Sequence, residues 1–203
     1  MGCLIEKINS LKDFEIGFVI RRRLKEFESV SPEEFFSELC FCLLTANFQA
    51  EKSIKIQEEI GDGFFGLEKE ELAFRLKELG HRFWPQRAER IVLARKYKDF
   101  LSELILRDSF VARDWLVENV KGLGMKEASH FLRNVGKKDL AIIDFHVIDL
   151  LVRFGIIDKP KSLNRARYLE IEKVLRRLSE RLGMNLAELD LYLWYLETGK
   201  VLK

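Results

Sequence analysis

The sequence predicts an all-α fold of about ten helices, and three observations lead to this prediction. Apolar residues recur every three or four positions along the 203-residue chain, as at Leu72, Leu76 and Leu79, which is the period of an amphipathic helix. The alternating pattern typical of strands is scarce. Glycines follow many of the helical stretches, at the position where glycine commonly ends a helix.

The helices can be placed in order along the chain. Residues 13–28 carry Phe14, Phe18 and Leu24 at helical spacing. Ser31, Pro32 and Glu34 are typical of a helix start, with an N-cap, a first-turn proline and a capping Glu, so a second helix is expected over residues 32–46. The remaining helices are expected over residues 50–60, 68–79, 85–107, 110–120, 125–135, 145–154, 163–182 and 186–198, with ends uncertain by ~2 to 4 residues. The glycines expected just after helices are Gly61, Gly80, Gly136, Gly155, Gly183 and Gly199.

Composition excludes several classes of protein. No apolar run approaches the roughly 20 residues of a membrane span, and residues 1–10 lack the features of a signal peptide, so a cytoplasmic protein is expected. Cys40 and Cys42 point to different helix faces, and three cysteines in all argue against a disulfide framework or a cysteine metal site. The net charge of +2 does not identify a partner. Abundant Lys, Arg and Glu with only three Gln is a balance often met in thermophile proteins.

The chain contains no long linker, low-complexity tract or internal repeat. Two compact helical subdomains that share one interface are therefore expected, rather than two separate domains on a tether. Residues 32–138 are expected to form one subdomain, and residues 1–31 together with 139–203 the other.

The most informative stretch is residues 120–128, which lies between two predicted helices. Gly122 and Gly124 flank Leu123 and form a tight turn, because glycine permits positive φ and close approach of the backbone. The helix that follows offers unpaired N–H groups and the positive end of its dipole. This arrangement suits a phosphate, although the same pattern also suits an αα-corner without a ligand.

Two functional groups accompany the hairpin. Lys126 lies at the start of the second helix, and Asp144 opens the next predicted helix 18 residues later. A carboxylate at a helix start is most often only an N-cap. An amine and a carboxylate at this spacing after a Gly-x-Gly turn form a more specific combination than either residue alone.

With Gly122, Gly124, Lys126, Asp144 and His146, the chain resembles the helix-hairpin-helix DNA glycosylase superfamily. Bifunctional members of that superfamily carry a G-x-G-x-K hairpin and a downstream Asp in a D-x-H setting. The resemblance implies base flipping, attack of Lys126 on C1′ to form a Schiff base, and β-elimination of the 3′ phosphate. It implies that Asp144 stabilises the oxocarbenium-like sugar and that the hairpin lies at the cleft between the two subdomains. His146 is either a phosphate contact beside the hairpin glycines or simply packed.

Other stretches resemble the compact type-2, archaeal-style 8-oxoguanine DNA glycosylase/AP lyase branch, and the likeness covers essentially the full chain. The implied partner is double-stranded DNA that contains 8-oxoguanine or an abasic site. Asn47 matches the position of a polar wedge that fills the hole left by the flipped base. Trp194 and Phe83 match stacking positions, although only a local match favours Phe83 over Trp84. The resemblance also places Lys203 at the base, through a carboxylate, a carbonyl or its ammonium group.

No cofactor is expected to be required. No cysteine lies beyond Cys42, so the C-terminal iron–sulfur cluster of the endonuclease III branch is not expected, while hairpin carbonyls in this superfamily can hold a monovalent cation. A prokaryotic, nucleoid-associated monomer without membrane contact is expected. Three alternatives remain open: a noncatalytic helix-hairpin-helix DNA-binding module, a glycosylase of the same superfamily that acts on oxidised pyrimidines or an adenine mispair, and a helical scaffold.

Overall fold

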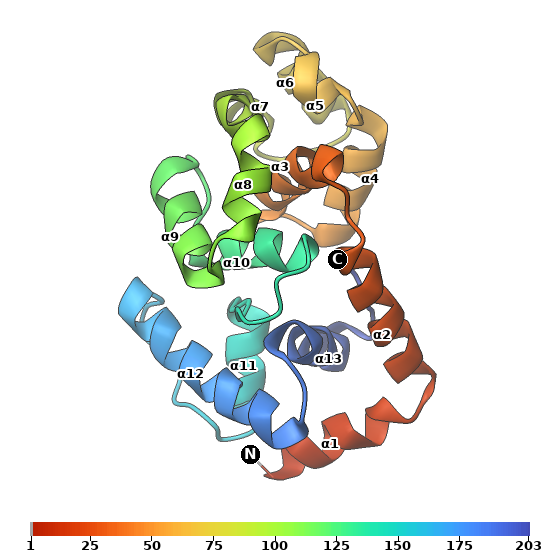
Figure 1. The fold of residues 1–203 in the computed structure, drawn as a ribbon, viewed down its shortest axis with the longest axis vertical. Helices are drawn as coiled ribbons and strands as arrows, with labels where there is room; N and C mark the ends of the chain where they lie inside the picture. The colour runs from red at the N-terminus through yellow and green to blue at the C-terminus, as the bar shows by residue number, and fades with distance from the viewer. Residues whose placement is uncertain (1) are drawn as a thin grey trace. The chain divides into compact units, whose positions relative to one another are not determined.

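The structure is a computed structural model that describes residues 2–203, so that Met1, part of an expected subdomain, lies outside the described residues. Within that range the protein contains thirteen α-helices, two 3-10 helices and no strand, which confirms the predicted all-α class (Figure 1). The helices are α1 (Gly2–Lys12), α2 (Glu15–Glu28), η1 (Pro32–Glu34), α3 (Phe35–Thr45), α4 (Ala50–Ile60), α5 (Gly63–Gly66), α6 (Lys69–Glu78), α7 (Trp84–Ala94), η2 (Arg95–Phe100), α8 (Leu101–Leu106), α9 (Ser109–Asn119), α10 (Met125–Asn134), α11 (Phe145–Arg153), α12 (Arg165–Leu182) and α13 (Leu186–Thr198).

The chain divides into two compact units. Val30–Val135 forms the first, here called the hairpin unit, and the residues up to Ser29 together with Gly136–Lys203 form the second, here called the terminal unit. The boundaries expected from the sequence fall two to three residues later in the chain.

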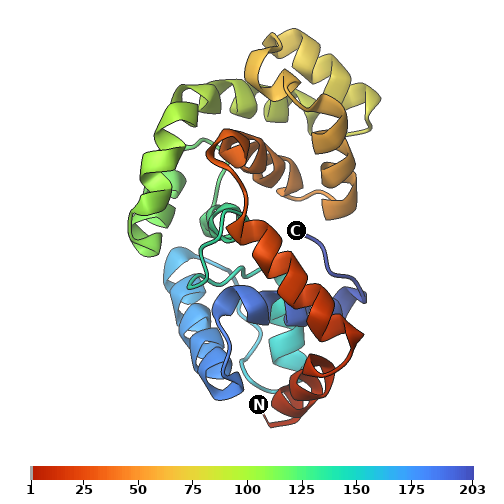
Figure 2. The same cartoon turned by 45° about the vertical axis from the view of Figure 1, so that its right-hand side comes forward.

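Helix α3 is the core of the hairpin unit. Ten of its eleven residues are buried, including Leu39, Phe41 and Leu43. A helix that is apolar on all sides must be enclosed, and α4, α7, α8 and α10 pack around α3 (Figures 1 and 2). The turn after α3 and the start of α10 are therefore attached to the same core.

The terminal unit is built around α13, which packs against α2, α11 and α12 (Figure 2). The turn between α1 and α2 depends on Gly17, because a Cβ atom there would lie 2.1 Å from the carbonyl oxygen of Lys12. This unit carries Asp144 at the start of α11 and Trp194 within α13.

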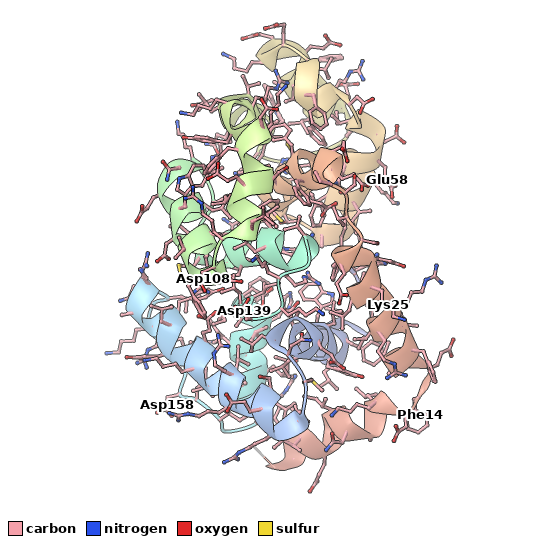
Figure 3. The ribbon with its side chains drawn as sticks, viewed as in Figure 1. Phe14, Lys25, Glu58, Asp108, Asp139 and Asp158 are labelled. Carbon is pink, nitrogen blue, oxygen red and sulfur yellow. The ribbon has the colours of Figure 1, made fainter. Side chains whose placement is uncertain are left out.

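Several local predictions are confirmed. All six glycines expected just after helices have positive φ, between 49° and 94°. The backbone N–H of Ser31 donates to Glu34 Oε2 at 2.9 Å, so the predicted capping interaction is present, although it opens with the short η1 before α3 begins. A cap that was not predicted is made by Asp108, which is labelled in Figure 3. Its carboxylate accepts from the N–H groups of Phe110 and Val111 at the start of α9.

Other predictions are wrong. The thirteen α-helices of residues 2–203 exceed the ten expected spans by three, because α1 and the four-residue α5 were missed and one expected span contains both α7 and α8. Leu4 and Ile8 of α1 have the helical spacing and are fully buried, but no capping residue announces the helix. The single helix expected over residues 85–107 is interrupted by η2, where Arg95 donates to the carbonyl oxygens of Phe64 and Leu67 at 2.8 and 2.6 Å. Across residues 2–203, no helix is long and apolar enough to span a bilayer.

Candidate active site

Lys126 lies in the first turn of α10, and its side chain is 23% exposed. Its Nζ lies 3.9 Å from Glu127 Oε1 and donates no hydrogen bond to another described residue. A cation in the first turn faces the positive end of the helix dipole, which costs roughly 0.3 to 1 kcal/mol. The stability of α10 therefore gives no reason for a lysine at this position.

The hairpin before Lys126 is held against α7. Gly122 has φ of 98°, and a Cβ atom there would lie 2.5 Å from Cδ of Arg90, so the Arg90 side chain covers this glycine. Lys121 Nζ donates to Glu89 Oε1 at 2.8 Å. The predicted need for glycine is thus confirmed at Gly122 by its positive φ, while the flexible side chain of Arg90 could move aside for a Cβ atom.

Glu127 closes the hairpin from the other side. Its Oε2 accepts from the backbone N–H of Gly124 at 3.3 Å, in the manner of a capping box. The first amides of α10 remain directed out of the helix, as at any helix start, and a phosphate is a suitable acceptor for them. Whether Gly122 and Gly124 bind a DNA phosphate stays a prediction.

The end of α3 and the turn that follows it lie in the same unit and are here together called the Asn47 turn (residues 44–48). Asn47 is exposed and is the one non-glycine residue among those described that has positive φ, at 58°. Arg82 Nη2 donates to the Asn47 carbonyl at 2.9 Å, and Arg87 Nη2 donates to the Ala46 carbonyl at 2.5 Å. The predicted wedge residue is therefore carried on a turn whose backbone is bound by side chains from residues 81–87.

His81 makes the third contact with this turn. Its Nδ1 accepts from the backbone N–H of Phe83 at 3.1 Å, so Nε2 carries the proton of the neutral ring and donates to the Leu44 carbonyl at 3.1 Å. The imidazole is 1% exposed and lies against the ring of Phe48, with 4.1 Å between ring centroids. Burial lowers the pKa of His81, and the nearby positive charges of Arg87 and Arg82 lower it further.

This lowered pKa makes the stability contribution of His81 pH-dependent. His81 of the unfolded chain takes up a proton as the pH falls below about 6.5, whereas folded His81 does so only at lower pH. Its contribution is therefore complete above pH 6.5 and is lost as the pH falls. We expect the difference in unfolding free energy between the parent protein and His81→Gln, measured by urea denaturation, to shrink between pH 7.5 and pH 5.5. A constant difference would contradict this expectation.

Phe83, the predicted stacking residue, precedes α7 and is partly exposed. The guanidinium carbons of Arg82 and Arg87 lie 4.5 and 5.5 Å from its ring centroid. The neighbouring Trp84 is contacted instead by Lys77, whose Nζ lies 5.7 Å from the indole. The two arginines that contact the Phe83 ring therefore also donate to carbonyls of the Asn47 turn, whereas the lysine that contacts Trp84 does not.

In the terminal unit, Asp144 is the N-cap of α11. Its Oδ1 accepts from the backbone N–H of Val147 at 3.0 Å. Its second oxygen accepts no hydrogen bond from another described residue, and the side chain is partly exposed. Capping therefore occupies one carboxylate oxygen and leaves the other available for a ligand.

His146 is packed between two aromatic rings. Its ring centroid lies 4.0 Å from that of Phe145 and 5.2 Å from that of Trp194, the latter edge to face. The indole Nε1 of Trp194 is buried and has no hydrogen-bond partner among the described residues. Both of the roles considered for His146, phosphate contact and packed side chain, are compatible with its partial exposure.

The structure groups the predicted residues by unit. Lys126, Gly122, Gly124, Asn47 and Phe83 belong to the hairpin unit. Asp144, His146, Trp194 and Lys203 belong to the terminal unit, where Lys203 is partly exposed beyond the end of α13. Within residues 2–203, no three His, Cys, Asp or Glu side chains are grouped so as to hold a metal ion.

Sequence reasoning missed two residues, His81 and Arg87. Arg87 occupies the buried face of α7 together with Ala88, Ile91 and Ala94, so a charged residue at an apolar position of the helical period was an available signal. For His81 there was no such signal, because its role follows from bonds to Leu44, 37 residues away.

Comparison with known proteins gives consistent matches over the whole chain. A family model described as 8-oxoguanine DNA glycosylase matches residues 20–184. The 8-oxoguanine DNA glycosylase/AP lyase of Korarchaeum cryptofilum is 57% identical over 204 residues, covering 98% of each chain. The Methanocaldococcus jannaschii 8-oxoguanine glycosylase/lyase, solved in complex with a 15mer DNA containing 8-oxoguanine, matches with a TM-score of 0.95 and 54% identity over 99% of this chain and 100% of that one. The Thermotoga maritima 8-oxoguanine DNA glycosylase matches with a TM-score of 0.93 and 46% identity over 98% of each chain.

Proposed function

Because the chain belongs to the 8-oxoguanine DNA glycosylase family, we propose that it excises 8-oxoguanine from double-stranded DNA and then cleaves the strand at the abasic site. The observation that carries the proposal is the position of Lys126. It provides a primary amine beside a hairpin suited to a phosphate, at a helix position where a lysine does not help the fold. The relatives of this chain named above are archaeal and bacterial, so the substrate is the DNA of a prokaryotic cell.

Lys126 supplies the nucleophile for both reactions. Its free amine attacks C1′ of the flipped nucleotide, and the base leaves with a proton. The C1′–O4′ bond then breaks, O4′ takes up a proton from Nζ, and the opened sugar is held as a Schiff base between Nζ and C1′. The Schiff base acidifies the C2′ proton, and loss of that proton expels the 3′ phosphate. Water then hydrolyses the imine and releases Lys126. One residue therefore accounts for both base excision and strand cleavage.

Asp144 acts on the sugar. As the bond between C1′ and the base breaks, positive charge develops on the sugar ring, and a fixed carboxylate stabilises that charge. The structure supports this role because only one of the two carboxylate oxygens is used in capping α11. The same carboxylate can relay the proton that the departing base requires.

Base recognition must separate 8-oxoguanine from guanine. The lesion carries a proton on N7 and an oxygen on C8, so a discriminating pocket needs an acceptor aimed at N7–H, and plain guanine leaves that acceptor unpaired. We assign stacking on the base to Trp194 and Phe83, and the polar contact to Lys203. The partial exposure of Phe83, Trp194 and Lys203 is compatible with these contacts.

Loss of Lys203 should therefore separate the two activities. We expect deletion of Lys203 to lower kcat/KM for 8-oxoguanine excision about tenfold or more, which corresponds to one hydrogen bond to the base. Cleavage at a preformed abasic site should persist, because that reaction needs Lys126 but no base. Gel assays on duplexes carrying either lesion measure both rates. Equal loss on both substrates, or no loss on either, would place the N7–H acceptor elsewhere.

DNA binding should depend steeply on salt even though the net charge is only +2. Phosphate contacts release counterions, and the slope of log K against log salt is about −0.9 for each phosphate neutralised. For a duplex carrying a stable abasic analogue, we expect a slope of about −3 or steeper by fluorescence anisotropy. A flat dependence would argue against DNA as the partner.

Borohydride trapping tests the function directly. The parent protein should become covalently linked to a duplex containing 8-oxoguanine, and not to the same duplex with guanine at that position. Absence of trapping even at an abasic site would favour a noncatalytic DNA-binding module. Trapping at an abasic site or at an oxidised pyrimidine, but not at 8-oxoguanine, would indicate a glycosylase for another lesion.

We propose no required cofactor. The carbonyl oxygens of residues 121–123 accept no hydrogen bond from another described residue, so they would be the ligands of a monovalent cation at the hairpin. Such a cation would supply positive charge for a bound phosphate. Lys126 and Asp144 perform every chemical step proposed above.

A further inference from the structure

Arg87 is buried without the partners that a buried cation normally has. The residue is 3% exposed, and its one hydrogen bond runs from Nη2 to the Ala46 carbonyl. Nε and Nη1 are buried and have no hydrogen-bond partner among residues 2–203, and no carboxylate in that range forms an ion pair with Arg87. Burial lowers the pKa of Arg87 to about 10.

Stability gives little reason for an arginine at this position. A buried charge is costly unless it is paired and fully hydrogen-bonded. The neighbours on the same face of α7, Ala88 and Ile91, are fully buried apolar residues, so an unbranched apolar side chain would suit the position. The guanidinium of this costly arginine lies 5.5 Å from the ring centroid of Phe83 and donates to one backbone carbonyl, and its presence is better explained by what these contacts position.

The contact positions the Asn47 turn. Asn47 adopts positive φ, a conformation that non-glycine residues hold only when their surroundings impose it. The carbonyl oxygens of residues 44, 46 and 47 accept from His81, Arg87 and Arg82 in turn. Backbone bound at three of four consecutive carbonyl groups, with an exposed polar side chain at its end, is a preorganised contact surface.

The same helix also fixes the hairpin. Glu89 binds Lys121, Arg90 lies over Gly122, and the charge of Glu127 acts on Arg87 itself. Helix α7 therefore sets the distance between the Asn47 turn and the hairpin that carries Lys126, within one unit of the chain.

We propose that Arg87 is a positioning residue, which holds Asn47 where its side chain fills the space left in the duplex by the flipped nucleotide. This inference rests on the proposed function. Arg87 does not touch DNA in this proposal, since it is buried. Its guanidinium also lies near the Phe83 ring, and the proposal assigns its effect on base flipping to Asn47. A residue that acts only through another loses its effect when the other is removed.

A double-mutant cycle on base flipping tests this dependence. A 2-aminopurine placed next to 8-oxoguanine fluoresces when the lesion leaves the stack, and the Lys126→Gln background prevents turnover. At saturating protein, we expect Arg87→Met to lower the fluorescence rise at least threefold and Arg87→Lys, which keeps one donor, to lower it less. Asn47→Gly should lower it similarly, and adding Arg87→Lys to Asn47→Gly should have no further effect.

Arg95→Met is the matched control. Arg95 lies in the same unit and also donates only to backbone carbonyls, those of Phe64, Leu67 and Gly63. Thermal denaturation should show a loss of stability in Arg95→Met, which removes three hydrogen bonds, at least as large as any loss in Arg87→Met, while the fluorescence rise of Arg95→Met stays at the parent level. Asn47→Gly and Arg87→Lys keep the cycle interpretable if Arg87→Met does not fold, since glycine accepts positive φ and lysine preserves the charge.

Three outcomes would overturn the inference: an unchanged fluorescence rise in Arg87→Met and Arg87→Lys, an equal reduction in Arg95→Met, or full additivity of Arg87→Lys with Asn47→Gly. Failure of the proposed function would give a different result. If the protein does not flip and excise 8-oxoguanine, the Lys126→Gln protein itself would show no fluorescence rise, and the parent protein would not be trapped on 8-oxoguanine DNA.

Discussion

Lys126→Gln is expected to abolish borohydride trapping and strand cleavage and to lower base excision by about four orders of magnitude, the scale on which an enzyme loses its nucleophile. Glutamine is similar in length but cannot form a Schiff base with C1′. The fold should be unaffected, because the amine makes no hydrogen bond to another described residue and its ion-pair partner, Glu127, is 3.9 Å away. We expect the unfolding free energy to change by less than about 0.5 kcal/mol.

Two further variants separate nucleophilicity from charge. Lys126→Arg keeps a cation beside the hairpin, so DNA affinity measured by anisotropy should stay close to that of the parent protein while trapping is lost. Lys121→Gln removes a lysine from the same hairpin, one whose Nζ is bound to Glu89, and should leave trapping intact. If Lys126→Gln were trapped as efficiently as the parent protein, another amine would be the nucleophile.

The features that could be predicted from the sequence are those that local interactions determine. Helix ends at Ser31 and Gly183 depend on bonds within a few residues, and both are found as expected. The hairpin could be recognised because the positive φ of Gly122 is a requirement of the turn itself and does not depend on where the two helices pack.

The features that could not be predicted depend on contacts between distant segments. Helix α1 is held by packing of Leu4 and Ile8, with α2 and α12 as its neighbours. The 3-10 segment η2 coincides with bonds from Arg95 to carbonyls about 30 residues earlier in the chain. The same limit applies to Arg87, whose single bond joins α7 to Ala46, 41 residues away. The candidate residues Lys126 and Asp144 could therefore be found in the sequence more easily than the contacts that Arg87 and Arg95 make.

Asp144→Asn should lower the rate of base excision by about 10² to 10³-fold, which corresponds to ~2.7 to 4 kcal/mol in activation free energy. The substitution removes the negative charge that stabilises the positive charge developing on the sugar. Asparagine is as good an N-cap as aspartate, and Asn164 and Asn185 already cap α12 and α13 in the same unit. The substitution therefore removes the charge of Asp144 and keeps its cap. Affinity for a duplex with a stable abasic analogue should change by no more than about twofold, as expected for an interaction made mainly in the transition state.

Asp108→Asn is the matched control for this prediction. Asp108 is also an N-cap aspartate, at the start of α9, and accepts from Phe110 and Val111 at 2.9 and 3.1 Å. The two variants should have similar thermal stability, and only Asp144→Asn should lose excision in single-turnover assays. Asp144→Ala should also lose about 1 kcal/mol of stability, because alanine cannot cap α11. If Asp144→Asn excised 8-oxoguanine at the parent rate while Asp144→Ala unfolded, the carboxylate would be only a cap, and stabilisation of the sugar would have to come from another group.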